Sequence, residues 1–222
     1  MKPARPALPD WDRIDTVLLD LDGTLLDLHY DNHFWQEVVP AAWARARGIP
    51  LEEARAVLKR RFEAIEGTLD WYSVVHWSEQ LGLDLPTLKQ QDTERLRWLP
   101  GARDFLVRAR AAGKRLVLIT NSHPVALSIK DAQTGVLQLF DAGYSSHQFH
   151  APKELPEFWE RLLVEEPYDR ERSLFVDDNL NVLRAARRAG IAQIWAVRRP
   201  DSSRPARVHE EFSSVDGVAE LI

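Results

Sequence analysis

The chain has 222 residues, a net charge of −5 at pH 7 and no cysteine. A slightly acidic chain lacks the basic face that phosphate contacts need, so neither nucleic acid nor an anionic membrane surface is an expected partner. The lack of cysteine excludes disulfides, thiol catalysis and cysteine-bound metal. The sequence has no signal-peptide pattern and no run of about 18 apolar residues, so we expect a cytoplasmic protein without a membrane span.

Short apolar runs that alternate with helical patterns indicate the fold class. Five runs predict buried strands at Thr16–Leu19, Arg115–Ile119, Ala142–Ser145, Ser173–Val176 and Ala192–Val197. Helical stripes of apolar residues lie between or before them, over Gly101–Ala112, Pro124–Gln133, Pro156–Glu165 and Leu180–Ala189. Strands that are apolar on both faces are typical of a sheet covered by helices on each side. The sequence therefore predicts an α/β chain with a Rossmann-like, doubly wound parallel sheet.

One interval in this alternation is too long for a single strand–helix unit. Such a unit takes about 30 residues, whereas Asp20 and Thr120 lie 100 positions apart. The extra segment has helical patterns over Asn32–Arg47, Leu51–Glu66, Trp71–Leu81 and Pro86–Trp98. We therefore predict a core formed by residues 1–26 and 100–222, with a helical cap inserted at residues 27–99. A cap in this position would lie over the carboxyl edge of the sheet, where open α/β sheets bind ligands.

Two pairs of acidic residues follow predicted strands. Asp20 and Asp22 come directly after the first strand, within DLDGTLLD, and Asp177 and Asp178 come directly after the fourth. Taken alone, the first pair could form a turn and Asp178 could cap the next helix. Adjacent carboxylates repel one another unless a cation lies between them, and hard divalent cations prefer carboxylate oxygens. Because parallel strands end at one edge of the sheet, the four acids predict a Mg²⁺ site there.

The remaining two segments at strand ends suit an anion. Thr120, Asn121 and Ser122 follow the second strand and offer a hydroxyl, an amide and free N–H groups at a helix start. The alternative is that Ser122 only caps that helix. Lys153 precedes another predicted helix, and a lysine is a compact charge suited to phosphate, although an exposed surface lysine is the alternative. Together with the acids, these groups predict a phosphoryl-transfer site.

In their order along the chain, these segments resemble the four motifs of the haloacid dehalogenase superfamily. The string DLDGT at residues 20–24 is similar to the first motif, and the other three are similar at Thr120, Lys153 and Asp177-Asp178. The insert lies between the first and second motifs, as the helical caps of that family do. The strings DNHFWQEVVP, TLDWYSVVHWSEQLGLDL and LITNSHPVALSIK resemble the bacterial GMP/IMP 5′-nucleotidase subgroup. The resemblance implies a phosphoric monoester hydrolase.

The resemblance also implies a role for each of these side chains. Asp20 would attack phosphorus and form an aspartyl-phosphate. Asp22 would protonate the leaving oxygen and then take a proton from the attacking water. Thr120 and the Asn121 N–H would bind the phosphoryl oxygens, and Lys153 would neutralise their charge. The family's dehalogenases lack an acid at the position of Asp22, so this residue implies an oxygen leaving group, hence a phosphatase or a phosphomutase.

Mg²⁺ is the cofactor that the resemblance implies. The Asp20 carboxylate, the main-chain carbonyl of Asp22 and the Asp178 carboxylate would hold it. Asp177 would reach the metal directly or through water. The sequence leaves open which of the last two acids contacts the metal, and the usual strand end of the family favours Asp178.

The predicted substrate is a small phosphomonoester, a purine nucleoside 5′-monophosphate, recognised by the cap. The candidates for stacking on the base or contacting its edge are Asn32, Phe34, Trp35, Trp71, Tyr72, Trp77 and, after the second strand, His123. The alternative for the aromatic residues is that they form the core of the helical bundle.

Two other functions stay open from the sequence. The first is a phosphatase of the same chemistry that acts on a sugar phosphate or on phosphoglycolate. The second, more distant, is a phospho-receiver signalling domain, which also gathers acids, a hydroxyl and a lysine on a parallel sheet. Receivers carry their acidic pair near the start of the chain and have no cap, whereas here the Asp177-Asp178 pair comes last. The sequence does not indicate an oligomeric state.

Overall fold

The computed structural model describes residues 8–208 and 210–222. Six strands form one sheet in the order β3-β2-β1-β4-β5-β6, and every neighbouring pair is parallel. The strands are β1 Thr16–Leu19, β2 Arg115–Thr120, β3 Ala142–Ser145, β4 Ser173–Asp177, β5 Gln193–Val197 and β6 Ser213–Val215. The five predicted strands are all present, which confirms the parallel sheet.

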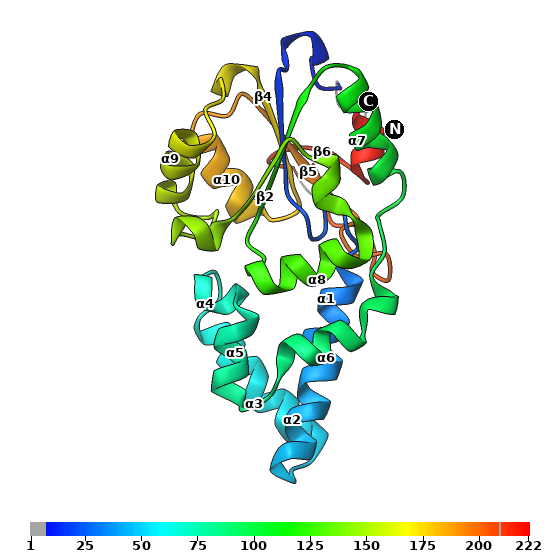
Figure 1. The fold of residues 1–222 in the computed structure, drawn as a ribbon, viewed down its shortest axis with the longest axis vertical. Helices are drawn as coiled ribbons and strands as arrows, with labels where there is room; N and C mark the ends of the chain where they lie inside the picture. The colour runs from blue at the N-terminus through cyan, green and yellow to red at the C-terminus, as the bar shows by residue number, and fades with distance from the viewer. Residues whose placement is uncertain (1–7, 209) are drawn as a thin grey trace.

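Helices cover both faces of this sheet (Figure 1). Helix α7 (Ala102–Ala111) lies on one side, and helices α9 (Pro156–Glu165) and α10 (Leu180–Arg188) lie on the other. Successive side chains of a strand point to opposite faces. In β1, Val17 therefore packs in the core beneath α7, and Leu18 packs in the core beneath α9 and α10. Both faces of the sheet are therefore covered by apolar layers, as the doubly wound prediction requires.

The sixth strand was not predicted. β6 begins with two serines, Ser213 and Ser214, and only Val215 in it is buried. A three-residue edge strand with one apolar side chain leaves no alternating pattern in the sequence. Short 3₁₀ helices complete the core at Trp11–Arg13, Val136–Leu139, Ser146–Phe149, Arg170–Arg172 and Val218–Leu221.

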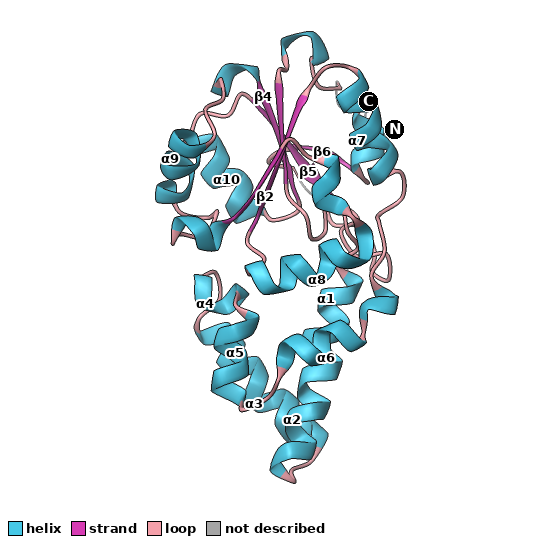
Figure 2. Ribbon diagram, in the orientation of Figure 1, coloured by secondary structure: helices cyan, strands magenta, loops and turns pink. Residues whose placement is uncertain are grey.

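The segment between β1 and α7 forms a separate helical layer beyond one end of the sheet, as Figure 2 shows in cyan. Its elements are α1 His29–His33, a π-helical turn at Phe34–Val38, α2 Val39–Arg47, α3 Leu51–Ala64, α4 Leu69–Tyr72, α5 Val74–Leu81, α6 Leu85–Gln91 and a 3₁₀ turn at Thr93–Arg95. An apolar cluster that includes Trp43, Leu58 and Leu81 lies at the centre of this layer, and Ala126, from the segment after β2, belongs to the same cluster. We refer to this layer as the insert.

The segments by which the chain enters and leaves the insert lie side by side. Asp27 N donates to the Arg97 carbonyl at 2.9 Å, and Leu99 N donates to the Leu25 carbonyl at 2.8 Å. These two hydrogen bonds join the segment that enters the insert to the segment that leaves it. The division at residues 27–99 into an independent cap stays a prediction.

Two predicted helices of the insert have different ends in the structure. The segment Trp71–Leu81 is interrupted at Ser73, whose hydroxyl accepts from His76 N at 3.0 Å and starts a new helix. The segment Pro86–Trp98 is α-helical only to Gln91, where α6 ends, and continues as a short 3₁₀ turn at Thr93–Arg95. At Ser73 a short polar side chain competes with the helical backbone, and helical periodicity alone does not reveal this.

Helix α8 (Pro124–Thr134) belongs to the core, yet it packs against α5 and α6 of the insert. Its N-cap is His123, whose Nδ1 accepts from Val125 N at 3.2 Å, so the alternative that Ser122 only caps this helix is wrong. No helix among residues 8–208 and 210–222 is long and apolar enough to cross a membrane. The signal-peptide prediction rests partly on residues 1–7, which lie outside the described residues.

Candidate active site

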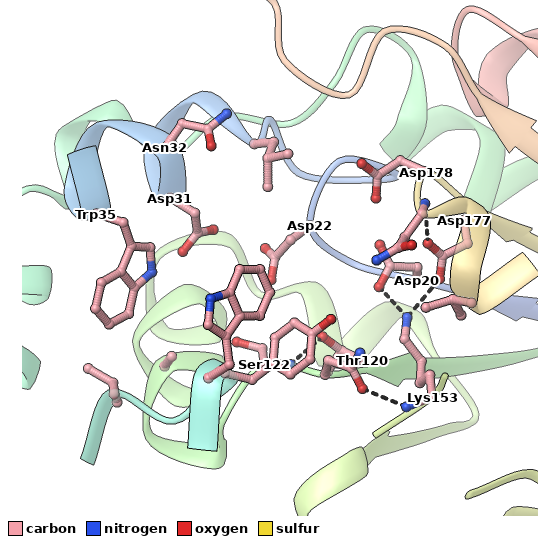
Figure 3. Close-up of a pocket in the computed structure, with 18 of the residues that line it drawn as sticks. Asp20, Asp22, Asp31, Asn32, Trp35, Thr120, Ser122, Lys153, Asp177 and Asp178 are labelled. Carbon is pink, nitrogen blue, oxygen red and sulfur yellow. Dashed lines mark hydrogen bonds and ion pairs between the residues drawn. The ribbon is translucent and has the colours of Figure 1, made fainter. Parts of the chain in front are cut away.

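The carboxyl ends of three adjacent strands bring the predicted residues together (Figure 3). Asp20 follows β1, Thr120 ends β2 and Asp177 ends β4, and the sheet order places these strands side by side. Lys153 reaches the same point from the loop after β3. A cavity of about 610 Å³ opens there, between the sheet edge and the insert.

Lys153 forms buried ion pairs with two of the aspartates at the sheet edge, Asp20 and Asp177. Its Nζ lies 2.6 Å from Asp20 Oδ1 and 2.8 Å from Asp177 Oδ2, and it also donates to the Ile119 carbonyl at 3.2 Å. Burial disfavours the ammonium, but the two carboxylates outweigh it and raise the pKa of Lys153. The alternative of an exposed surface lysine is wrong, because the side chain is 2% exposed.

Asn121 fixes the loop that carries this lysine. Its side-chain oxygen accepts from Lys153 N at 2.9 Å, and its amide donates to Glu154 at 3.0 Å. Thr120 and Asn121 both line the cavity beside Lys153, and so does Ser122. The group of hydroxyl, amide and ammonium is suited to an anion with several oxygens.

Three carboxylates gather at one end of the cavity. Asp20, Asp177 and Asp178 each offer an oxygen, and these oxygens all lie within 4.8 Å of one another. Asp20 Oδ2 is buried and has no hydrogen-bond partner in the described structure. Burial, which outweighs the pull of Lys153, raises the pKa of Asp20 to about 6, and burial with the nearby Asp20 charge raises the pKa of Asp178 to about 7. A divalent cation with oxygen ligands would relieve this crowding, so the residues fit Mg²⁺.

Gly23 makes room for this acidic cluster. Its φ is +90°, and a Cβ at this position would lie 2.8 Å from Asp178 Cγ and 2.9 Å from Pro200 Cβ. A larger residue would push Asp178 out of place. Arg207, which the sequence analysis did not single out, holds the same carboxylate at 2.8 Å.

Asp22 belongs to a second group of charges, in which the lysines are buried and the aspartates half-buried, and the other members of this group were not predicted. Its Oδ2 lies 2.6 Å from Lys130 Nζ, and Lys130 Nζ lies 2.9 Å from Asp31 Oδ2. Lys89 then reaches Asp31 Oδ1 at 2.6 Å. The sequence carried one signal for these lysines: Lys130 and Lys89 follow the buried residues Ala126 and Leu85 by four positions, which places them on the buried faces of α8 and α6.

The opposite end of the cavity is lined by the insert. Of the residues predicted to contact a substrate, Asn32, Trp35, Trp71, Tyr72 and Trp77 line the cavity. Tyr72 lies near Asn121, because its hydroxyl donates to Glu154 at 2.6 Å and the Asn121 amide donates to the same carboxylate. Gln36 and Phe62 line the cavity as well and were not predicted. In Figure 3, Trp35 and Asn32 lie on the far side of Asp22 from the acidic cluster.

Two predicted substrate residues do not line the cavity. Phe34 is fully buried in the core of the insert, with its ring 5.1 Å from Trp35 in an edge-to-face arrangement. His123 caps α8 and packs against the ring of His147 at 4.8 Å. Both side chains serve packing and helix capping where a substrate contact was expected.

Comparison with known proteins agrees with this site. The haloacid dehalogenase-like hydrolase family matches residues 14–190 of the chain. The GMP/IMP nucleotidase YrfG of Escherichia coli (strain K12) is 37% identical over 212 residues, which cover 96% of each chain, and the protein of the same name from Shigella flexneri matches equally. The chain belongs to the haloacid dehalogenase-like hydrolase family. It is an enzyme of the phosphoric monoester hydrolase class.

Solved structures of low sequence identity share the fold. The haloacid dehalogenase (HAD) phosphatase from Thermococcus onnurineus has a TM-score of 0.79 at 20% identity, over 94% of this chain and 96% of that one. The L-2-haloacid dehalogenase from Xanthobacter autotrophicus has a TM-score of 0.64 at 20% identity, with the same coverage. These similarities confirm the predicted fold class, and membership of the family rules out the receiver-domain alternative.

Proposed function

We propose that the protein is a Mg²⁺-dependent 5′-nucleotidase that hydrolyses purine nucleoside monophosphates such as GMP and IMP. The observation that carries this proposal is one cavity with two unlike ends. Lysine-held carboxylates lie at one end, and tryptophans lie at the other. The 37% identity to a GMP/IMP nucleotidase supports the same substrate class. We also propose that it acts in the cytoplasm on free nucleotides, since its net charge of −5 does not favour nucleic acid.

Asp20 is the nucleophile in this proposal. Lys153 takes one lone pair of Asp20 Oδ1 and fixes the carboxylate, which leaves lone pairs for phosphorus and for a metal. The Asp20–phosphorus bond forms as the bond from phosphorus to the 5′ oxygen breaks, and Asp22 gives its proton to that oxygen. Water then attacks the aspartyl-phosphate, Asp22 takes the proton from the water, and inorganic phosphate leaves.

Other side chains hold the phosphoryl group during both steps. Thr120, Asn121 and Lys153 contact its oxygens in this proposal, since all three line the cavity next to Asp20. Mg²⁺ would be held by Asp20, Asp178, the Asp22 carbonyl and Asp177, and it supplies positive charge to the phosphoryl oxygens when it is bound. A buried site with fixed charges stabilises the transition state without rearranging solvent.

The purine lies at the tryptophan end of the cavity in this proposal. Trp35 and Trp71 offer flat faces on which a base stacks, and a base–aromatic stack contributes about 1–3 kcal/mol. Asn32 and Gln36 line the same region and offer polar groups for the base edge or the ribose. Asn32 is held in place by a 2.6 Å hydrogen bond to Asp201.

A substrate panel tests the proposed function. We expect kcat/KM for phosphate release to be highest with GMP and IMP, and lower with pyrimidine nucleotides, glucose phosphates and phosphoglycolate. Trp35→Leu should raise KM for GMP about 5- to 160-fold through loss of one stack. Trp43→Leu is the matched control, because Trp43 lies in the core of the insert and away from the cavity. A preference for a sugar phosphate or for phosphoglycolate would replace the nucleotidase proposal with the corresponding phosphatase.

Removal of divalent metal tests the acidic site. We expect EDTA to stop phosphate release and Mg²⁺ to restore it. Because cation binding relieves the repulsion among Asp20, Asp177 and Asp178, Mg²⁺ should also raise the midpoint of thermal unfolding. Calorimetry with and without Mg²⁺ measures the shift. Full activity in EDTA would contradict the proposed metal site.

A further inference from the structure

A chain of four charged side chains, two buried lysines and two half-buried aspartates, links the core to the insert beside Asp22. It runs from Asp22 to Lys130, then to Asp31 and Lys89, with nitrogen–oxygen distances of 2.6, 2.9 and 2.6 Å. Both lysines are 1% exposed. Asp22 and Lys130 belong to the core, whereas Asp31 lies on α1 and Lys89 on α6 of the insert.

Such a chain is a poor way to gain stability. Each buried ion loses its hydration, and a packed apolar residue of the same volume is often as stable or more stable. The chain also contributes to the wall of the cavity, since all four side chains line it. A role beyond packing is therefore indicated for the member that contacts Asp22, which is Lys130.

Lys130 is itself held on both sides. Asp31 accepts from it with Oδ2 and is anchored from behind by Lys89 at Oδ1. Lys89 is fixed in turn, because its ammonium lies 4.5 Å and 4.3 Å from the ring centres of Tyr30 and Phe34. The Lys130 ammonium therefore has little freedom to move, and its contact with Asp22 has a defined direction.

We propose that Lys130 is a positioning residue that orients Asp22 toward the leaving oxygen of the substrate. This proposal rests on the proposed function, in which Asp22 is the proton donor. Lys130 engages Asp22 Oδ2, which leaves Oδ1 as the oxygen that carries the proton. The Asp22 side chain is 20% exposed, so it keeps access to the cavity. Because Asp31 comes from the insert, the correct orientation of Asp22 also requires the insert to be docked.

Substrates with different leaving groups distinguish a positioning role of Lys130 from a purely structural one. A nucleoside 5′ oxygen needs a proton to leave, whereas nitrophenolate leaves from p-nitrophenyl phosphate without one. We expect Lys130→Met to lower the ratio of kcat/KM for GMP to kcat/KM for p-nitrophenyl phosphate by about 10- to 100-fold. Asp22→Asn should lower the same ratio by about 10²- to 10⁴-fold.

Two further variants keep the test decisive. Lys59→Met is the matched control, because Lys59 is 74% exposed on α3 and should leave the ratio unchanged. Asp31→Asn weakens the ion pair that holds Lys130 and keeps the size of the side chain. It should lower the ratio of the two kcat/KM values by a smaller factor than Lys130→Met. This variant provides the test if Lys130→Met does not fold. If Lys130→Met and Asp31→Asn lower kcat/KM equally for GMP and p-nitrophenyl phosphate, Lys130 does not position Asp22. If Asp22→Asn still lowers kcat/KM selectively for GMP in that case, only the positioning role is overturned and the proton donor stands. An equal loss in Asp22→Asn would overturn the proposed proton donor and this proposal with it.

Discussion

Replacing Asp20 by asparagine should abolish phosphate release while the fold stays intact. Asparagine keeps the shape of the side chain, and its oxygen still accepts from Lys153, but an amide is not a nucleophile toward phosphorus. Removal of a nucleophile from a preorganised site typically costs on the order of 10⁴- to 10⁶-fold in kcat. We expect a loss in that range for GMP and for p-nitrophenyl phosphate alike, because both require attack on phosphorus. Steady-state assays of released phosphate measure it.

The control for this variant is a nearby acid outside the cavity. Asp15 precedes β1, is exposed and pairs with Arg172, so Asp15→Asn should keep its activity. Circular dichroism and thermal unfolding of Asp20→Asn should match those of the wild type within a few degrees. Acid-quenched wild-type enzyme with substrate should carry phosphate on the peptide that contains Asp20. Phosphate release that survives in Asp20→Asn would place the nucleophile elsewhere.

The parts of the fold that follow apolar patterns were predictable, and those set by single polar side chains were not. β1 and β4 are buried along their whole length, so each left a run of apolar residues in the sequence. β6 left none, because two of its three residues are serines. The interruption at Ser73 depends on one hydroxyl that accepts from His76 N, and it falls within an unbroken helical pattern.

The residues of the acidic end were predictable for a topological reason. Asp20, Thr120 and Asp177 each lie at the end of a strand, and parallel strands bring their ends to one edge. Lys130 and Lys89 lie within helices, where a lysine is usually on the solvated face. Only the three-dimensional arrangement places them opposite Asp22 and Asp31, so their pairing could not be derived from the sequence.

The aromatic residues of the insert show a finer limit of prediction. Phe34 and Trp35 are neighbours in a helical turn, so their side chains point in different directions. Trp35 lines the cavity, whereas Phe34 is buried in the core of the insert. Which of the two faces the substrate depends on how the π-helical turn Phe34–Val38 packs within the insert, and a run of aromatic residues does not specify that.

Replacing Lys153 by methionine should remove activity and also lower the stability of the fold. The variant leaves Asp20 and Asp177 buried without the ammonium that lies 2.6 and 2.8 Å from them. Removal of one partner of a buried ion pair costs about 3–5 kcal/mol in the free energy of unfolding. Lys59→Met, on an exposed lysine, is the control and should change neither property. Chemical unfolding in urea measures the difference.

The pH dependence of that deficit separates a charge effect from a packing effect. Burial already raises the pKa of Asp20 and of Asp177 to about 6, above the value of 3.8 for the ordinary carboxyl group. Without Lys153 both values should rise further, so the native state of the variant binds protons that the unfolded chain releases. Its free energy of unfolding must then fall as pH rises from about 4 through the native pKa values. We expect the deficit of Lys153→Met relative to wild type to be larger at pH 8 than at pH 5, and a deficit independent of pH would indicate lost packing instead.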